Sequence, residues 1–179
     1  MKKTCWMLVL VGMVGLCLSI GNAAIWEDDT KEITECAYCG MDRDKFAHSR
    51  MLIEYEEGSV EGTCSIHCAA IDLALNIEKI PKAIMVGDYG TKKLIDAEKA
   101  FWGIGGNKMG VMTKRAKWAF EKKEDAEKFV KENGGKVSTF DEAMMAAYED
   151  MYADTKMIRE RRKSIRPDHG TKKMEHDKK

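Results

Sequence analysis

The chain carries sulfur side chains in two short groups that suit a metal ion. The stretch ECAYCGM places Cys36 three positions before Cys39 and continues to Met41, and the stretch CSIHC begins at Cys64 and ends at Cys68. Four thiols in a C-x2-C and C-x3-C arrangement suit a tetrahedral zinc site. The thioether of Met41 instead favours Cu(I), because thiolate and thioether ligands together select a soft ion.

Two further side chains extend the candidate ligand set. His67 lies within the second cysteine group, and its role is inferred from this spacing alone. Met109 lies on a glycine-flanked turn in the stretch NKMGVM. Four methionines on the expected C-terminal helix are interpreted as packing residues, because methionine commonly fills gaps in cores. They are Met144, Met145, Met151 and Met157. His48 has no partner in the sequence and is expected at the surface.

Two other interpretations of the cysteines stay open. In an oxidising compartment Cys36 with Cys39, and Cys64 with Cys68, would form disulfides, although loops this short strain the bond and make it reducible. Thiol exchange is the third interpretation. It is disfavoured because the CxxC group precedes a loop and a hairpin rather than the helix of a thioredoxin-like unit.

The first residues have the pattern of an export signal. Lys2 and Lys3 are followed by an apolar run over residues 5–20 and by small residues at 21–24. This predicts a signal peptide that is cleaved near Ala23, and a periplasmic protein. The apolar run is shorter than the roughly 20 residues of a spanning helix, which disfavours an uncleaved anchor. A lipid anchor on Cys17 is also disfavoured, because Leu16 precedes it where lipoprotein processing requires a small residue.

Size and charge exclude some classes of protein. The chain has 179 residues, with 30 basic and 30 acidic side chains and a formal net charge of zero. A chain of this length can form a core without covalent staples, so the cysteines need another explanation. The balanced charge gives no support to nucleic acid or an anionic membrane as a partner.

The hydrophobic patterns predict two successive ββαβ units, which is an α+β fold. A long C-terminal helix follows, and the polar end from residue 159 onward is expected to be disordered. The expected strands are 49–56, 59–65, 82–86, 94–104, 110–120 and 136–140, and the expected helices are 66–77, 122–133 and 141–162.

Several stretches in order along residues 33–146 resemble the NosL family, the copper-binding accessory proteins of nitrous oxide reductase assembly. They are CAYCGM, LIDAEKAFW, MGVMTKRAKWAF, ENGG and VSTFDEA. The resemblance implies two ββαβ subdomains in an arrangement similar to the organomercurial lyase MerB. The implied organisation is a signal peptide (1–24), a NosL-like domain (25–146, with halves of about 33–90 and 91–146) and a helix end with a charged tail (147–179).

The resemblance also implies a function and some of its residues. It implies a periplasmic Cu(I) carrier that passes copper to an apo-enzyme such as nitrous oxide reductase, with a membrane copper-delivery complex as a further partner. Family ligands match Cys39 and Met41 of the Cys-Gly-Met motif and Met109 of the later Met-Gly motif. This chain departs from the family in having no good lipobox and in having a second cysteine group.

No enzyme is expected, because the sequence contains no Ser-His-Asp set, no paired carboxylates at a cleft and no phosphate-binding glycine loop before a helix. Two alternatives from other classes remain. One is an exported structural or binding domain held by disulfides or zinc. The other is a MerB-like enzyme that cleaves carbon–metal bonds with its cysteine thiolates.

Overall fold

The computed structural model describes residues 29–165. The predicted signal peptide, the cleavage site near Ala23 and the tail after residue 165 lie outside the described residues. Among residues 29–165, no helix is both long enough and apolar enough to cross a membrane.

The first sheet contains four antiparallel strands in the order β2-β1-β3-β4. Its central strand β1 carries apolar side chains that are almost all buried, because helices and loops cover the sheet. A short helix α1 precedes the sheet, and helix α2 connects β2 to β3. The bounds are α1 Asp29–Glu32, β1 Met51–Tyr55, β2 Val60–Thr63, α2 Ile66–Leu75, β3 Pro81–Gly87 and β4 Leu94–Asp96.

The second sheet contains three antiparallel strands in the order β6-β5-β7. Helix α3 connects β6 to β7 and ends at Gly134, whose φ of 80° is a conformation that favours glycine. The bounds are β5 Phe101–Ile104, β6 Lys117–Phe120, α3 Lys123–Asn133 and β7 Lys136–Ser138. The predicted order of two ββαβ units and an α+β fold is therefore confirmed.

Two predicted strands of the second unit were too long. The stretch 94–104 was expected to be one strand, but β4 pairs with β3 in the first sheet and β5 belongs to the second. Asp96 breaks the stretch, because its Oδ1 accepts hydrogen bonds from the backbone N–H groups of Glu98 and Lys99 and so forms a turn. Residues 110–116 were also expected in a strand, and they instead form a loop before β6.

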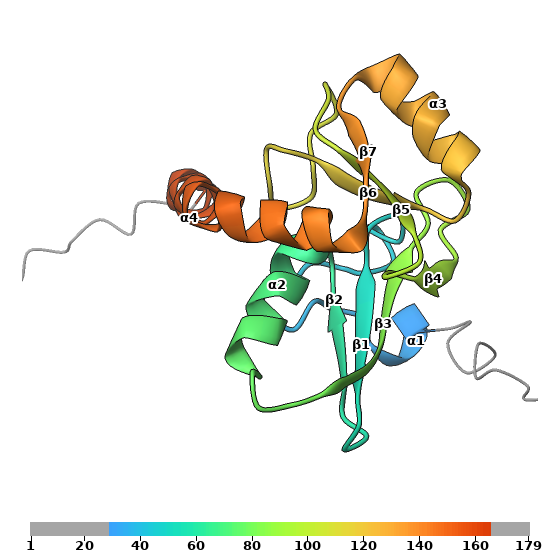
Figure 1. Cartoon of the computed structure of the whole chain (residues 1–179). Helices are drawn as coiled ribbons and strands as arrows, with labels where there is room; N and C mark the ends of the chain where they lie inside the picture. The colour runs from blue at the N-terminus through green and yellow to red at the C-terminus, as the bar shows by residue number, and fades with distance from the viewer. Residues whose placement is uncertain (1–28, 166–179) are drawn as a thin grey trace, which may run out of the picture.

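Helix α4 (Phe140–Ile165) lies across the junction of the two sheets, with α2 beside it (Figure 1). It begins with a capping box, in which Thr139 Oγ1 accepts from Glu142 N and Thr139 N donates to Glu142 Oε2. It continues beyond the predicted end at residue 162. Residues 159–162 were included in both the predicted helix and the predicted disordered tail, and the helix is correct for them. Residues 163–165 were wrongly assigned to the tail alone.

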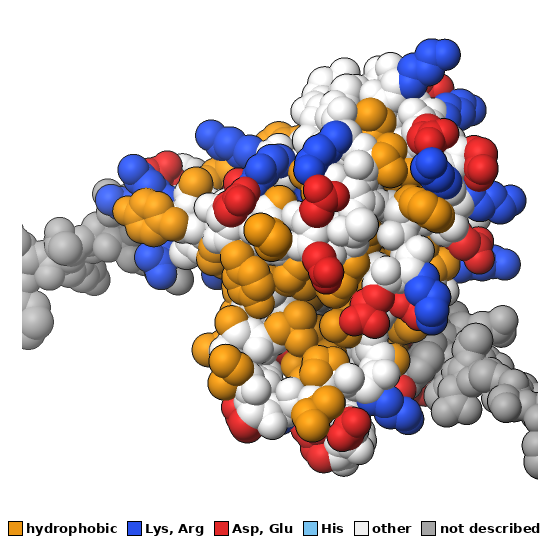
Figure 2. Space-filling view, viewed as in Figure 1, with side chains coloured by type: hydrophobic (Ala, Val, Ile, Leu, Met, Phe, Trp, Pro, Cys, Tyr) orange, Lys and Arg blue, Asp and Glu red, His pale blue; other side chains and the backbone are white. Residues whose placement is uncertain are grey.

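One hydrophobic core connects the two halves. It contains Ile53 of β1, Ala69 of α2, Trp102 of β5 and Ala143 of α4. The backbone also links the sheets, since Tyr89 N donates to the carbonyl of Ala119 at 2.8 Å. Apolar side chains also remain exposed on one face, over α4 and above α2 (Figure 2). Large exposed apolar residues of these two helices are Leu75, Met145, Tyr148, Tyr152 and Ile165.

Candidate metal centre

The loop ECAYCGM folds into a tight knuckle. Cys36 N donates to the carbonyl of Met41 at 2.8 Å, and Gly40 N donates to the carbonyl of Cys36 at 2.9 Å. Gly40 has a φ of 72°, a left-handed conformation that glycine adopts without steric cost. These two hydrogen bonds turn the chain so that the side chains of Cys36 and Cys39 lie on the same side.

The second cysteine group lies where β2 passes into α2. Cys64 directly follows the strand, Ser65 is the N-cap residue, and Cys68 lies in the first turn of the helix. Ser49 Oγ donates a hydrogen bond of 2.8 Å to the carbonyl of Cys64, which fixes the backbone at this junction.

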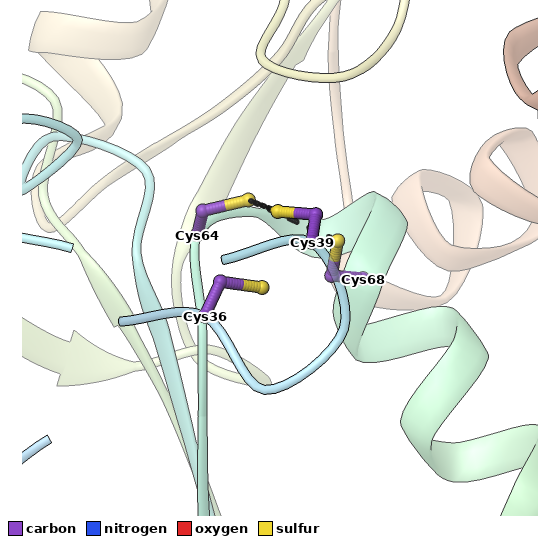
Figure 3. Close-up of side chains that lie close together, drawn as sticks. All are labelled: Cys36, Cys39, Cys64 and Cys68. Carbon is purple, nitrogen blue, oxygen red and sulfur yellow. Dashed lines mark hydrogen bonds between the residues drawn. The ribbon is translucent and has the colours of Figure 1, made fainter. Parts of the chain in front are cut away.

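The fold brings all four cysteines together, and their sulfur atoms lie within 4.8 Å of one another (Figure 3). The Sγ atoms of Cys39 and Cys64 are 3.5 Å apart, and those of Cys64 and Cys68 are 3.8 Å apart. A tetrahedral ion with bonds to sulfur of about 2.3 Å requires sulfur atoms roughly 3.8 Å apart. The cluster therefore has the size of a four-sulfur metal site.

The structure does not pair the cysteines as disulfides, and all four thiols are free. The shortest sulfur contact given above joins Cys39 of the knuckle to Cys64 of the hairpin, so it crosses between the two sequence groups. The disulfides considered from the sequence lay within each group. The convergence of all four sulfurs favours the metal-binding interpretation.

Three cysteines of the cluster are buried, and Cys39 is the more accessible one. Cys36, Cys64 and Cys68 are at most 2% exposed, whereas Cys39 is half-buried. Cys39 and Cys68 line a cavity of about 180 Å³ beside α4. Arg162, near the end of α4, donates to the carbonyl of Cys39 at 3.2 Å. An ion would reach the cluster past Cys39 and the end of this helix.

The four thiols do not ionise independently. The pKa of Cys36 is lowered, because Cys39, Cys64 and Cys68 donate hydrogen bonds that stabilise its thiolate. The pKa values of Cys64 and Cys68 are raised by hydrogen bonding to Cys36 and Cys39, and burial adds to the effect. The hydrogen bond to Cys36 raises the pKa of Cys39, but the hydrogen bonds from Cys64 and Cys68 outweigh it, so this pKa is lowered as well. The cluster thus favours thiolates at Cys36 and Cys39 and thiols at Cys64 and Cys68. A bound cation would displace the remaining protons.

A buried ion network fixes the knuckle to the first sheet. Arg43 is fully buried, and its guanidinium donates to Asp29 Oδ2 at 2.7 Å and to the carbonyls of Met51 and Thr63. Arg50 also donates to the carboxylate of Asp29, at 2.7 Å. Because Arg43 follows the knuckle and Thr63 precedes Cys64, this network holds the two cysteine groups in register.

A second buried carboxylate connects the knuckle to the helix that carries Cys68. Asp72 of α2 is fully buried and accepts hydrogen bonds from the hydroxyls of Tyr38 and Tyr55. The pKa of both tyrosines is raised, first by burial and then by the hydrogen bond to Asp72. The sequence does not indicate this connection, because a hairpin separates Tyr38 from Asp72.

The predicted methionines lie at different depths. Met41 packs against the cysteine cluster and lines a cavity of about 450 Å³. Met109 lines the same cavity but is 57% exposed, and it lies at the outer side of the site. Met112, which was not among the predicted ligands, packs against the cysteine cluster. The signal that could have identified it is the repeated methionine in MGVM.

Two histidines lie near the site, His67, which was predicted as a metal ligand, and His48, which was expected at the surface. His67 lines the smaller cavity with Cys39 and Cys68, but its Nδ1 lies 3.6 Å from Asp154 Oδ2 of α4. Burial lowers its pKa. His67 as a ligand therefore stays a prediction. His48 was expected at the surface; it is half-buried instead, with its ring centroid 5.3 Å from that of Trp118.

The fold and its sulfur cluster define a small α+β protein with a candidate metal centre. The NosL family matches residues 29–148, and the chain belongs to this family. A solved structure, the crystal structure of the copper chaperone NosL from Shewanella denitrificans, is 26% identical to this chain. The match covers 60% of this chain and 87% of that chain, with a TM-score of 0.49. No curated protein matches the chain.

Proposed function

We propose that this protein is an exported Cu(I) carrier that delivers copper to a maturing copper enzyme, such as nitrous oxide reductase. The observation that carries the proposal is the convergence of four cysteine sulfurs, with Met41 packed against them. Membership of the NosL family supports it. The ligands are Cys36, Cys39, Cys64 and Cys68 with Met41, and Met109 and His67 are the outer candidates.

The choice of Cu(I) depends on the thioethers. Thiolates alone bind zinc and copper ions well, whereas a thioether ligand is useful mainly to a soft ion. Met41 and Met112 both adjoin the thiols. Met109 lines the same cavity as Met41 but lies nearer the protein surface.

The half-buried position of Cys39 suits a carrier. A carrier in an oxidising compartment must hold Cu(I) without releasing it to solvent, and it must also give it up to a partner. Exchange of one ligand at a time meets both needs, because the ion is never free. Cys39 is the thiolate that a partner's ligand would reach first, since the other three cysteines are buried. No covalent turnover is part of this function.

A structural zinc site is the second candidate. The sulfur separations of 3.5 and 3.8 Å favour it, because they fit a tetrahedral Zn²⁺ ion closed by four thiolates. In that case the methionines only pack around the site, and no client enzyme is required.

A competition titration separates the two candidates. The reduced protein is titrated anaerobically with Cu(I) against a colorimetric Cu(I) chelator, and in parallel with Zn²⁺. We expect retention of Cu(I), and we expect Met41→Ala to weaken it by at least about tenfold while Zn²⁺ retention changes little. Zn²⁺ retention without a preference for Cu(I), or an unchanged Cu(I) affinity in Met41→Ala, would instead establish the structural zinc site.

A further inference from the structure

Met112 has an unusual backbone conformation for its residue type. Its φ is 63°, and among residues 29–165 the one other non-glycine residue with positive φ is Lys92. The left-handed region is costly for side chains with a Cβ atom. Residues held in such conformations cluster at ligand-binding and switch sites, where the surrounding structure imposes them.

The surrounding structure fixes the loop on both sides of Met112. Gly110 has no room for a side chain, because a Cβ atom there would lie 2.6 Å from the side chain of Thr113 and 2.9 Å from Ala116 Cα. Lys114 N donates to Asp154 Oδ1 of α4 at 3.4 Å. These contacts hold the loop against α4 and keep Met112 in its left-handed backbone conformation.

The side chain of Met112 lies between two cavities. It lines the cavity of about 180 Å³ with Cys39 and Cys68, and it also lines the cavity of about 450 Å³ with Met41 and Met109. Among the methionines of residues 29–165, it alone lines both cavities, and it packs against the cysteine cluster. A thioether at this position can contact an ion in either cavity.

We propose that Met112 is a further thioether ligand for the soft metal ion, and that it passes the ion between the four-cysteine cluster and the methionine-lined cavity. This inference depends on the proposed Cu(I) function and adds the route by which the ion enters and leaves. The lining residues favour a sulfur route over an aqueous one, because the larger cavity also includes Met157 of α4.

The transfer step needs no oxidant or reductant. A bond forms from Met112 Sδ to Cu(I) while the bond from one cysteine Sγ to the ion breaks. The released thiolate takes a proton from water, and copper remains Cu(I) throughout. Exchange with Met109 then brings the ion to the exposed side of the molecule, since that residue is 57% exposed.

The test compares Met112→Leu with Met144→Leu. Leucine keeps the apolar volume and a similar backbone preference but removes the sulfur atom. Met144 is a matched control, because it is also partly buried but packs against the main core. The rate of Cu(I) transfer from each loaded protein to an excess of chelator is measured by stopped flow. We expect Met112→Leu to slow transfer by at least about tenfold, with Zn²⁺ retention and thermal stability as in Met144→Leu.

The outcomes separate this inference from the proposed function. If the unsubstituted protein fails to retain Cu(I), the proposed function and this inference both fall. If it retains Cu(I) but Met112→Leu transfers the ion as fast as Met144→Leu, only this inference falls.

A second measurement covers a variant that does not fold. The unsubstituted protein is labelled with ¹³C at its methionine methyl groups and titrated with Cu(I). The Met112 methyl resonance must shift more than that of Met144. Equal or absent shifts would overturn the role of Met112 as a ligand.

Discussion

At the scale of single residues, the knuckle depends on the left-handed conformation of Gly40. Its φ is 72°, and a side chain there would meet no atom within 4 Å, so that the cost of Gly40→Ala is conformational rather than steric. We expect this substitution to lower the free energy of unfolding by about 1 kcal/mol. Because Gly40 lies between Cys39 and Met41, we also expect weaker Cu(I) retention in the chelator competition.

Gly58 provides a matched control for this prediction. Its φ is 93°, a side chain there would also meet no atom within 4 Å, and it lies in the turn between β1 and β2, away from the knuckle. Gly58→Ala should lose similar stability in urea unfolding but keep full Cu(I) retention. Equal retention in the two variants would show that the knuckle tolerates the change and that ligand geometry does not depend on Gly40.

The cysteine groups could be predicted at this scale because the spacing of the cysteines is read directly from the sequence. The hairpin between the groups was also visible, and it is the hairpin that brings Cys64 to Cys39. Met112 could be singled out only as the second methionine of MGVM, and nothing in the sequence distinguished Tyr38. The contact of Met112 with the thiols depends on a left-handed backbone conformation that the sequence does not indicate, and the role of Tyr38 depends on a carboxylate on α2.

At the scale of elements, α4 is fixed to the second sheet by a charged contact. Asp150 Oδ2 accepts hydrogen bonds of 2.8 Å from Arg115 Nε and from Lys117 Nζ of β6. The side chain of Lys117 is 1% exposed. Asp150→Asn therefore leaves the buried positive charge of Lys117 without a full negative partner. We expect the substitution to lower the free energy of unfolding by about 2 kcal/mol at pH 7. Chemical denaturation measures this loss.

The same contact gives a pH dependence of defined sign. Burial raises the pKa of Asp150, but the hydrogen bonds from Arg115 and Lys117 outweigh it, so that the pKa lies below its usual range. A lowered pKa means that the contact stabilises the fold above the unfolded-state pKa of about 3.9 and that this stabilisation is lost as the pH falls further. The difference in stability between the unsubstituted protein and Asp150→Asn should therefore shrink below pH 4.

Glu149→Gln is the control for the pH dependence. Glu149 also accepts from Arg115, at 2.8 Å, but its side chain is 63% exposed. Exposed ion pairs contribute little, so this variant should resemble the unsubstituted protein at every pH. A stability difference between Asp150→Asn and the unsubstituted protein that stays unchanged down to pH 2 would contradict the assignment to this carboxylate.

Element order was predictable because apolar periodicity recurs along the chain, and because Gly58 and Gly134 mark two of the turns between elements. The assignment of strands to sheets was not. The stretch 94–104 has the composition of one strand, but the turn at Asp96 divides it between two sheets, and local sequence does not show which neighbour each part will pair with. The end of α4 was missed because its last turns are polar. These turns continue the helix past Met157 and Ile158, which line the larger cavity.

At the scale of the whole molecule, we expect the candidate metal centre and the second sheet to unfold as one cooperative unit, because the two halves of the chain share one hydrophobic core. The cysteines lie on the first half, but the main core contains residues of both sheets and of α2 and α4. A ligand that binds only the folded state stabilises everything that unfolds with it, by about 2.7 kcal/mol when its free concentration is about 100 times Kd. Bound Cu(I) should therefore slow hydrogen exchange equally in β1 and in β5.

Hydrogen exchange with mass spectrometry tests this coupling on peptides that cover the two strands. The globally exchanging amides of β1 (Met51–Tyr55) and β5 (Phe101–Ile104) should gain protection by the same factor when Cu(I) is added. Cys68→Ser removes one sulfur from the cluster and should abolish most of this gain in both strands together. Protection confined to β1 would mean that the two halves unfold separately, and that the shared core around Trp102 does not transmit the stabilisation of the metal centre.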